Sequence, residues 1–414
     1  MKRALPLLTG LLLAGCVEYQ SAPIDWAAEV AGLGKEPSAV SFSLEDVRLR
    51  ALAFSPELNA LRLAHATSEA KAAAAGYWDD PSLNLDVLRV LKEPKNPWIA
   101  GGSVSFTLPI TGIPGLERRV AEAYSDADKW DVIAAEFATA AEAVTLAQTA
   151  QALQNLIAFL ERDLRAATYR EAREVSGRLV EAGEMNRTDF VQQAVAEQEI
   201  DQTLFDLRGE RLSAETKLRR LTGVSPTCVF TWDEEERLPE LATNAVTALD
   251  FIRAPRVRAA LARYEAKEID LKKEIRKQYP ELSAGPAYTR EDGYDRVGFT
   301  VGLTLPLWNR NRQGIAEAAG ARKEGQQAAI IAWRDVLGEF AEAQQSLALV
   351  GSWEVKSSRA EAERLYEAGE LSAGDYVACV QQDWAQHVSG MRRRIAALAS
   401  IHQINTFIKS LEEK

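Results

Sequence analysis

The chain has 414 residues, only three cysteines and a formal net charge of −11. An acidic chain without a basic block is poorly suited to nucleic acid, so no nucleic-acid partner is expected. Its three histidines stand singly, without a metal-ligand spacing, and no metal or other cofactor is predicted. The sequence also has no His-centred triad, nucleophile elbow or phosphate loop, and an enzyme is not expected.

Residues 1–15 have the pattern of a lipoprotein signal peptide. Lys2 and Arg3 precede an apolar stretch, residues 4–13, that is too short to cross a bilayer as a helix but suits a cleaved export signal. Leu-Ala-Gly then precedes Cys16, and this tetrapeptide resembles a bacterial lipobox. The resemblance implies cleavage before Cys16 and lipidation of that residue, palmitate included. An ordinary signal peptide with a chance cysteine is the alternative.

The lipid anchor predicts both a compartment and a charge. Residues 16–42 are expected to form an N-terminal lipid-anchored segment. Val17 follows Cys16 where an aspartate would suggest retention in the inner membrane, so attachment to outer-membrane lipid is expected. Removal of residues 1–15 takes away two positive charges and no negative ones, which moves the formal charge from −11 to −13. No run of 18 apolar residues follows, and no membrane-spanning helix is predicted.

Two long stretches without proline predict long helices. One lies between Pro114 and Pro226 and the other follows Pro306, and both are rich in residues that favour helix. Apolar residues in the first stretch alternate spacings of three and four, as in a coiled coil with one phase shift. They predict one helix from Leu116 to about Arg178, about 94 Å long. A rod of that length is typical of a coiled-coil assembly.

The two halves of the chain repeat each other, which indicates gene duplication. The matches pair Pro56 with Pro255, Pro81 with Pro280, Leu108-Pro109 with Leu305-Pro306, Arg178–Glu184 with Arg364–Glu370, and Asp189-Phe190 with Asp375-Tyr376. Residues 43–226 are predicted to form the first repeat, residues 227–247 a linker with the acidic run Asp233–Glu236, and residues 248–411 the second repeat. Each repeat is expected to read helix, strand, hairpin loop, strand, long helix, tight turn, helix.

Short segments of alternating polarity predict two strands in each repeat. They are residues 82–87, 103–108, 282–288 and 297–305, with hairpin loops near residues 92–100 and 290–296. One interpretation is a pair of half-buried hairpins packed on helices. The strand length of about ten residues suits instead a tilted transmembrane strand.

Aromatic residues at the strand junctions favour the membrane interpretation. Such residues typically form a belt at the membrane interface; here they are Tyr77, Trp78, Tyr279 and Trp308. Four strands cannot close a barrel, and an open strand edge is not viable in lipid. A homotrimer that supplies twelve strands is therefore predicted.

One motif follows the last predicted strand. It reads Leu-Pro-Leu-Trp-Asn-Arg-Asn-Arg-Gln-Gly over residues 305–314, and Ile-Ala-Glu-Ala comes next. With the lipobox, the duplication and the two Glu-Ala-Gly-Glu turns, it resembles the TolC-type outer-membrane factor family of tripartite efflux and secretion systems, from about residue 43 to residue 411. The form of the motif is most similar to members that work with heavy-metal pumps.

The resemblance implies a mainly α, TolC-like fold with a transmembrane β hairpin pair. Three chains would form a 12-stranded β-barrel in the outer membrane, continued by a long periplasmic α-helical barrel. The implied function is a passive efflux duct that a periplasmic adaptor (membrane fusion) protein opens and joins to an inner-membrane RND-type pump. The excess of acidic residues would favour heavy-metal cations if those residues line the pore. Acidic residues that merely solvate outer helix faces are the alternative.

The resemblance places the periplasmic tip, with its gating or adaptor-docking contacts, at the two Glu-Ala-Gly-Glu turns. The residues concerned are Gly183, Asp189, Tyr366, Gly369 and Asp375. Glycine permits the backbone that a tight helix–helix turn demands. Both aspartates are expected to cap the outgoing helices, with a gating role only if they face the pore. Ala378 stands where the best-known member has a further aspartate, so no aspartate ring is expected at that level.

The two remaining cysteines are predicted to be free. Cys379 lies about 15 Å along a helix from its tip glycine, whereas Cys228 lies about 68 Å from the other tip glycine if that segment is all helical. A disulfide requires Cα atoms within about 7 Å. Two free, mostly buried thiols are therefore expected.

A function of another class stays open. A lipid-anchored periplasmic coiled-coil scaffold, or an adaptor protein without a pore, would share the lipobox and the long helices. It would lack four membrane-length strands placed symmetrically in a duplication. A stable trimer that depends on detergent would separate the two interpretations.

Overall fold

The structure, a computed structural model, describes residues 19–33, 39–89, 91, 98–232, 237–291, 293–350 and 358–412. The predicted signal peptide, the lipidation residue Cys16 and the acidic run Asp233–Glu236 lie outside these residues. Within the described part of the chain, no helix combines the length and apolarity needed to cross a membrane.

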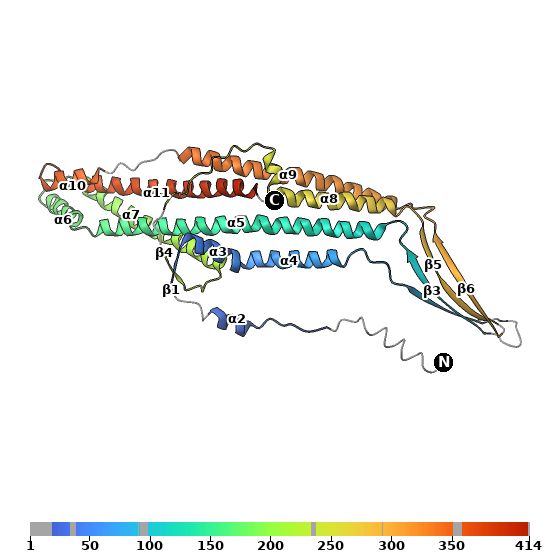
Figure 1. Cartoon of the computed structure of the whole chain (residues 1–414). Coiled ribbons are helices and arrows are strands. Elements are labelled where there is room, and N and C mark those ends of the chain that lie inside the picture. The colour runs from blue at the N-terminus through green and yellow to red at the C-terminus, as the bar shows by residue number, and fades with distance from the viewer. Residues whose placement is uncertain are drawn as a thin grey trace.

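The chain forms an elongated helical bundle with a β-sheet at one end and tight helical turns at the other (Figure 1). In chain order the elements are α2 (Trp26–Leu33), β1 (Ala39–Phe42), α3 (Leu44–Phe54), α4 (Pro56–Ala73), β2 (Ser82–Arg89), β3 (Trp98–Leu108), α5 (Ile113–Leu164), α6 (Ala167–Glu181), α7 (Arg187–Thr222), β4 (Val229–Trp232), the 3₁₀ helix η1 (Asp250–Arg253), α8 (Pro255–Arg276), β5 (Glu281–Glu291), β6 (Tyr294–Thr304), α9 (Arg312–Val350), α10 (Arg359–Glu367) and α11 (Ala373–Ser410).

The two halves have the same order of elements. Helix α4 corresponds to α8, the β2–β3 hairpin to β5–β6, α5 to α9, α6 to α10 and α7 to α11. Pro56 and Pro255 are the first residues of α4 and α8, where the missing proline N–H costs no helical hydrogen bond. Pro81 and Pro280 each directly precede a strand.

Helix α5 is the spine of the bundle. Its 52 residues span about 78 Å. Helices α4 and α8 pack on the part nearer the sheet, and α7 and α11 on the part nearer the turns (Figure 1). Helix α9 packs against α8 and α11.

The prediction of one helix from Leu116 to about Arg178 was wrong, because the helix breaks after Leu164. Ala166 has an extended backbone (φ −60°, ψ 133°) and begins α6. No proline or glycine marks the break. The redirected α6 buries Tyr169 and Ala172 in a core shared with α11, so tertiary packing overrides local helix propensity.

The segment predicted to be a linker contains strand β4. Val229–Trp232 pairs in parallel with Ala39–Phe42 of β1, so this segment joins the N-terminal part of the chain to the end of α7. Phe42 and Phe230 pack with Ala143 and Ala147 of α5 in the same core cluster.

The sheet contains the predicted strands in the order β2-β3-β5-β6, all antiparallel. Its loops are shorter than expected. Trp98–Ala100 already belongs to β3, while residues 92–97 lie outside the described chain. Arg290 and Arg296 are ladder residues of β5 and β6, because the hairpin turns at Gly293, which has a φ of +82°.

The largest core cluster lies between the helices at the turn end. It joins α5, α6, α7, α10 and α11 and includes Leu160, Tyr169, Leu207 and Trp384. Neither Cys228 nor Cys379 forms a disulfide within the described residues, as predicted: Cys228 is buried in the core cluster that includes Phe42, and the half-buried Cys379 packs against the turn-end core.

Candidate functional site

The four-stranded sheet has one apolar and one polar face. Residues that pair across a ladder share a face, so the pairing defines both sets. The apolar face comprises Leu83, Leu85 and Val87 of β2, Ala100, Gly102, Val104 and Phe106 of β3, Leu282, Ala284, Pro286 and Tyr288 of β5, and Val297, Phe299, Val301 and Leu303 of β6. The polar face comprises Ser82, Asn84, Asp86, Gly101, Ser103, Ser105, Thr107, Glu281, Ser283, Gly285, Ala287, Thr289, Arg296, Gly298, Thr300, Gly302 and Thr304, together with the apolar pair Leu88 and Ile99 near the end of the β2–β3 hairpin.

No other segment among the described residues covers the apolar face. Phe299 is 85% exposed, Val297 82% and Leu85 73%. Large contiguous apolar patches of this kind mark contact with a membrane or a partner. Within the described residues the edge strands β2 and β6 each pair on one side only, so the sheet also has two open edges.

The motif at residues 305–314 turns the chain from β6 into α9. Arg310 and Asn311 both have positive φ, 46° and 50°. The amide nitrogen Nδ2 of Asn311 donates to the backbone oxygen of Glu274 (2.9 Å) and to its Oε2 (2.7 Å), which ties the turn to the end of α8. A Cβ at Gly314 would lie 2.6 Å from both Asn311 Oδ1 and Glu274 Oε2. The motif therefore serves the strand-to-helix junction.

The two Glu-Ala-Gly-Glu turns adopt the same backbone. Gly183 has a φ of +74° and Gly369 of +75°. In the first turn, Glu184 N donates to Leu179 O (2.9 Å) and Gly183 N to Val180 O (3.1 Å). Equivalent bonds of 2.8 and 3.0 Å close the second turn. Both are Schellman motifs, in which the glycine occupies the left-handed position that follows a helix.

The predicted capping role of Asp189 and Asp375 was wrong, because the caps lie three residues earlier. Asn186 caps α7 by accepting from the Thr188 N–H (3.0 Å). Ser372 caps α11 by accepting from Asp375 N–H (3.1 Å), and its hydroxyl donates to Asp375 Oδ2 (2.6 Å). Ser-x-x-Asp is a capping-box pattern, so the sequence did contain a signal for Ser372. Both aspartates are exposed first-turn residues, where a negative charge suits the helix dipole.

Tyr366 lies inside the turn-end packing. Its ring stacks on that of Tyr376, with 4.8 Å between centroids and 15° between planes. Burial, and next the nearby charge of Glu171 on α6, raise the pKa of the Tyr366 hydroxyl. Tyr366 thus packs against Tyr376 of its own helical hairpin, with the charge of Glu171 from the first repeat nearby.

Polar contacts also tie the α6–α7 hairpin and the end of α5 to the α10–α11 hairpin. Gln193 Nε2 donates to the Gly374 carbonyl (3.1 Å), and Gln381 Nε2 donates to the Gln193 carbonyl (2.9 Å). Asp163, at the end of α5, forms an ion pair with Arg359, the first residue of α10, and both side chains are largely buried. Sequence reasoning missed these residues, because nothing local distinguishes them from other charged or amide residues on long helices.

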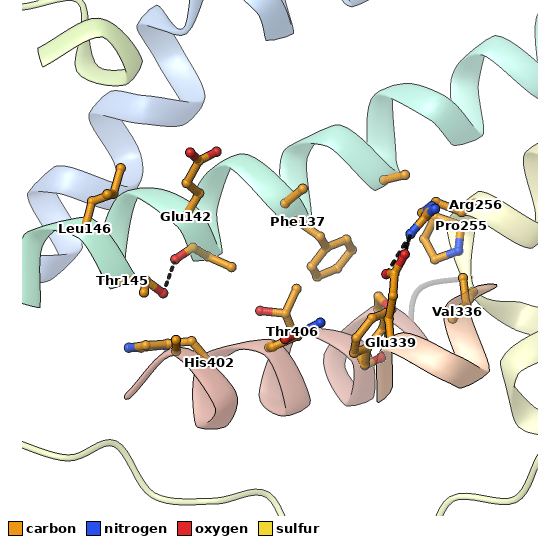
Figure 2. A pocket seen from close by; sticks show the side chains of 18 residues that line it. Phe137, Glu142, Thr145, Leu146, Pro255, Arg256, Val336, Glu339, His402 and Thr406 are labelled. Carbon is orange, nitrogen blue, oxygen red and sulfur yellow. Dashed lines mark hydrogen bonds and ion pairs between the residues drawn. The ribbon is translucent and has the colours of Figure 1, made fainter. Parts of the chain in front are cut away.

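A cavity of about 360 Å³ is lined by residues of α5, α8, α9 and α11 (Figure 2). Its walls are mainly apolar, with Phe137 of α5 at the centre of the view. Arg256 and Glu339 at one end are paired with each other at 2.7 Å. His402 at the other end has its Nε2 2.5 Å from Gln148 Oε1, and burial lowers its pKa. The arrangement offers a neutral imidazole already engaged by an amide rather than a nucleophile with a base.

Known proteins resemble this chain in structure but not detectably in sequence. No model of a known protein family matches the sequence, and no curated protein matches it. Solved structures do match.

Three of these structures align over nearly their full length. A membrane protein from Pseudomonas aeruginosa aligns with a TM-score of 0.72 at 15% identity, over 96% of this chain and 97% of that one. CusC, described for its transmembrane channel formation, has a TM-score of 0.67 at 16% identity, over 95% of each chain. The open-state outer membrane channel MtrE of Neisseria gonorrhoeae has a TM-score of 0.67 at 15% identity, over 89% of this chain and 88% of that one. The chain therefore has the fold of TolC-type outer-membrane channels, as predicted.

Proposed function

We propose that this chain is one protomer of a homotrimeric outer-membrane duct that passes substrates to the exterior without catalysis. The observation that carries the proposal is the uncovered apolar face of the sheet, with Phe299 and Val297 more than four-fifths exposed. Lipid would cover that face, while the Ser-, Thr- and Gly-rich face would line a water-filled pore. Three copies supply the twelve strands that remove the open edges.

The lipid anchor on Cys16 is part of the proposal, and chain length supports it. Phe42 packs beside Ala143 of α5, which lies 30 residues, or about 45 Å, from the sheet-side end of that helix at Ile113. The 26 residues that follow Cys16 up to Phe42, eight of them helical in α2, reach about 70 Å. Traced from residue 33 back to residue 19, the described chain approaches the end of the bundle that carries the sheet (Figure 1). A lipidated Cys16 can therefore lie in the leaflet at the base of the strands.

The turn end is the proposed periplasmic tip. With the strands in the outer membrane, α5 places Gly183 and Gly369 at the opposite end of the bundle (Figure 1). A periplasmic adaptor protein and an inner-membrane RND-type pump are the proposed partners there. The contacts of Tyr366, Gln193 and Asp163 would hold the closed state, and adaptor binding would have to separate them for the pore to open.

Heavy-metal cations are the proposed cargo. The acidic mature chain, with its formal charge of −13, supports passage of cations if carboxylates line the helical barrel. The motif at residues 305–314 supports it less than its resemblance suggested, since Asn311 and Gly314 are engaged in a structural turn. Sensitivity of a gene-deletion strain to metal salts, compared with drugs, tests the cargo: sensitivity to drugs alone would refute it.

Single-channel conductance in planar bilayers, paired with the mass of the protein in detergent, tests the duct. A trimer with rare or small openings is expected, because the tip contacts are formed. A monomer without conductance would refute the duct and favour the other candidate, a lipid-anchored periplasmic coiled-coil scaffold or adaptor without a pore.

A further inference from the structure

The two edges of the sheet define how neighbouring copies join. Across the order β2-β3-β5-β6, strands β2 and β6 run antiparallel to each other, so β6 of one copy is antiparallel to β2 of the next. We propose that β2 of one protomer pairs with β6 of its neighbour in one register, with Ser82 opposite Thr304 and Arg89 opposite Val297. This inference rests on the proposed trimeric duct and deepens it, because it assigns a partner to each β2 residue at the subunit contact.

The two faces of the sheet restrict the register to every second residue. Apart from Leu88 and Tyr294 near the hairpin loops, the apolar side chains have odd numbers on both edges, as in Leu85 of β2 and Val301 of β6. A barrel keeps one apolar face toward lipid, so odd residues must lie opposite odd residues. The backbone requires the same parity. A row is the line of residues that lie opposite one another across the four strands. Along a row, hydrogen-bonded and non-hydrogen-bonded pairs alternate from one strand pair to the next. The backbone N–H and C=O groups that point away from the sheet therefore lie on the same rows in β2 and in β6.

The strand ends next to the helices select among the remaining registers. Ser82 pairs with Ser105, but β3 continues for three more residues to Leu108. Followed through the ladders to β6, Thr304 lies four rows beyond Ser82. The helix-side boundary of the sheet therefore steps by four residues from one edge to the other. A contact that places Ser82 opposite Thr304 makes these ends level, as strands leaving one membrane surface require.

The same register gives the strand tilt of known barrels. A step of four residues per copy is a shear of about 12 around twelve strands. With a rise of about 3.4 Å and a strand spacing of about 4.8 Å, the tilt is about 35°. Transmembrane barrels tilt by about 35–45°. A register that places Ser82 opposite Gly302, a step of two residues per copy, would tilt the strands by only about 20°. A register that places Thr304 opposite Asn84 would leave Ser82 and Leu83 without partners in β6.

Cysteine pairs in the full-length protein test the register. In a Cys379→Ser background, Leu85→Cys combined with Val301→Cys places two thiols directly opposite each other, within disulfide range. Oxidation in membranes should convert this variant to a covalent trimer that reductant returns to monomers. The matched controls combine Val301→Cys with Leu83→Cys or with Val87→Cys, each displaced by two residues along the same face, and should crosslink more slowly.

The outcomes separate the register from the duct. Faster crosslinking of either control pair would overturn the register and leave the trimer standing. If no pair crosslinks although the unmodified protein trimerises and conducts, the pairing of β2 with β6 is overturned. An unmodified protein that neither trimerises nor conducts would overturn the duct itself. Asp86→Cys with Thr300→Cys, opposite each other on the polar face, decides the matter if the lipid-facing variants fail to assemble.

Discussion

Gly183 and Gly369 show how one residue type determines the geometry of the tip. No atom lies within 4 Å of a Cβ built on either glycine, so space is not what excludes a side chain. The backbone conformation excludes it instead, because φ values of +74° and +75° are unfavourable for a residue with a Cβ. The repeated Ala-Gly sequence therefore encodes two identical turns without help from neighbouring chains.

Gly369→Ala is expected to lower the free energy of unfolding by about 1–2 kcal/mol, because alanine must adopt the left-handed conformation. Chemical denaturation of the detergent-solubilised protein measures this. Gly320→Ala is the matched control, since Gly320 lies within α9 with open space around it and ordinary φ, and alanine should stabilise it. A Gly369→Ala protein as stable as the unmodified one would contradict the turn's role, and unchanged efflux would count against adaptor docking at this turn.

His402 predicts a pH dependence at the cavity of Figure 2. Burial lowers its pKa below the ordinary value of 6.5, so the unfolded chain takes up a proton at higher pH than the folded chain does. The stability contributed by the neutral imidazole is present above about pH 6.5 and is lost as pH falls toward the folded pKa. Melting temperatures at pH 5 and pH 7.5 should differ less in His402→Gln. An equal difference in both proteins would refute this account.

At the scale of elements, the break between α5 and α6 brings distant helices together. The end of α5 places Asp163 against Arg359 at the start of α10, across the boundary between the two halves of the chain. The side chains are only 7% and 16% exposed, so the pair is shielded from solvent. In the proposed duct, this ion pair would be one of the contacts that hold the turn end closed.

Asp163→Asn should destabilise the protein by about 3–5 kcal/mol, because it removes the buried carboxylate that pairs with the largely buried Arg359. It should also raise the open probability of single channels. Arg364→Gln is the matched control. Its pair with Glu361 is 73% and 57% exposed and should contribute at most about 1 kcal/mol. Unchanged gating in a folded Asp163→Asn trimer would remove this pair from the closed-state contacts.

At the scale of the whole molecule, the sheet lies apart from the helical core. Among the described residues it has two open edges and an uncovered apolar face, and the helices pack along the bundle instead of on the sheet (Figure 1). The consequences of a mutation in a strand therefore depend on which face it lies on.

Phe299→Lys and Thr300→Lys compare the two faces at adjacent positions of β6. A lysine in place of Phe299 would face lipid and should cost about 2–4 kcal/mol near the bilayer midplane, with loss of trimer in membranes. A lysine in place of Thr300 should leave the trimer intact and reduce cation preference, measured as a shift in reversal potential. Equal loss of trimer in both variants would contradict the assignment of faces.

The sequence by itself determined the features that arise from local chemistry. Period-two alternation in residues 297–305 predicted β6, and the Ala-Gly pairs predicted the two turns, since each depends on the backbone preference or pattern of a few neighbouring residues. Tertiary structure decided the rest. The break at Ala166, the pairing of β1 with β4, and the Asp163–Arg359 contact follow from packing between segments far apart in the chain, which no local pattern records.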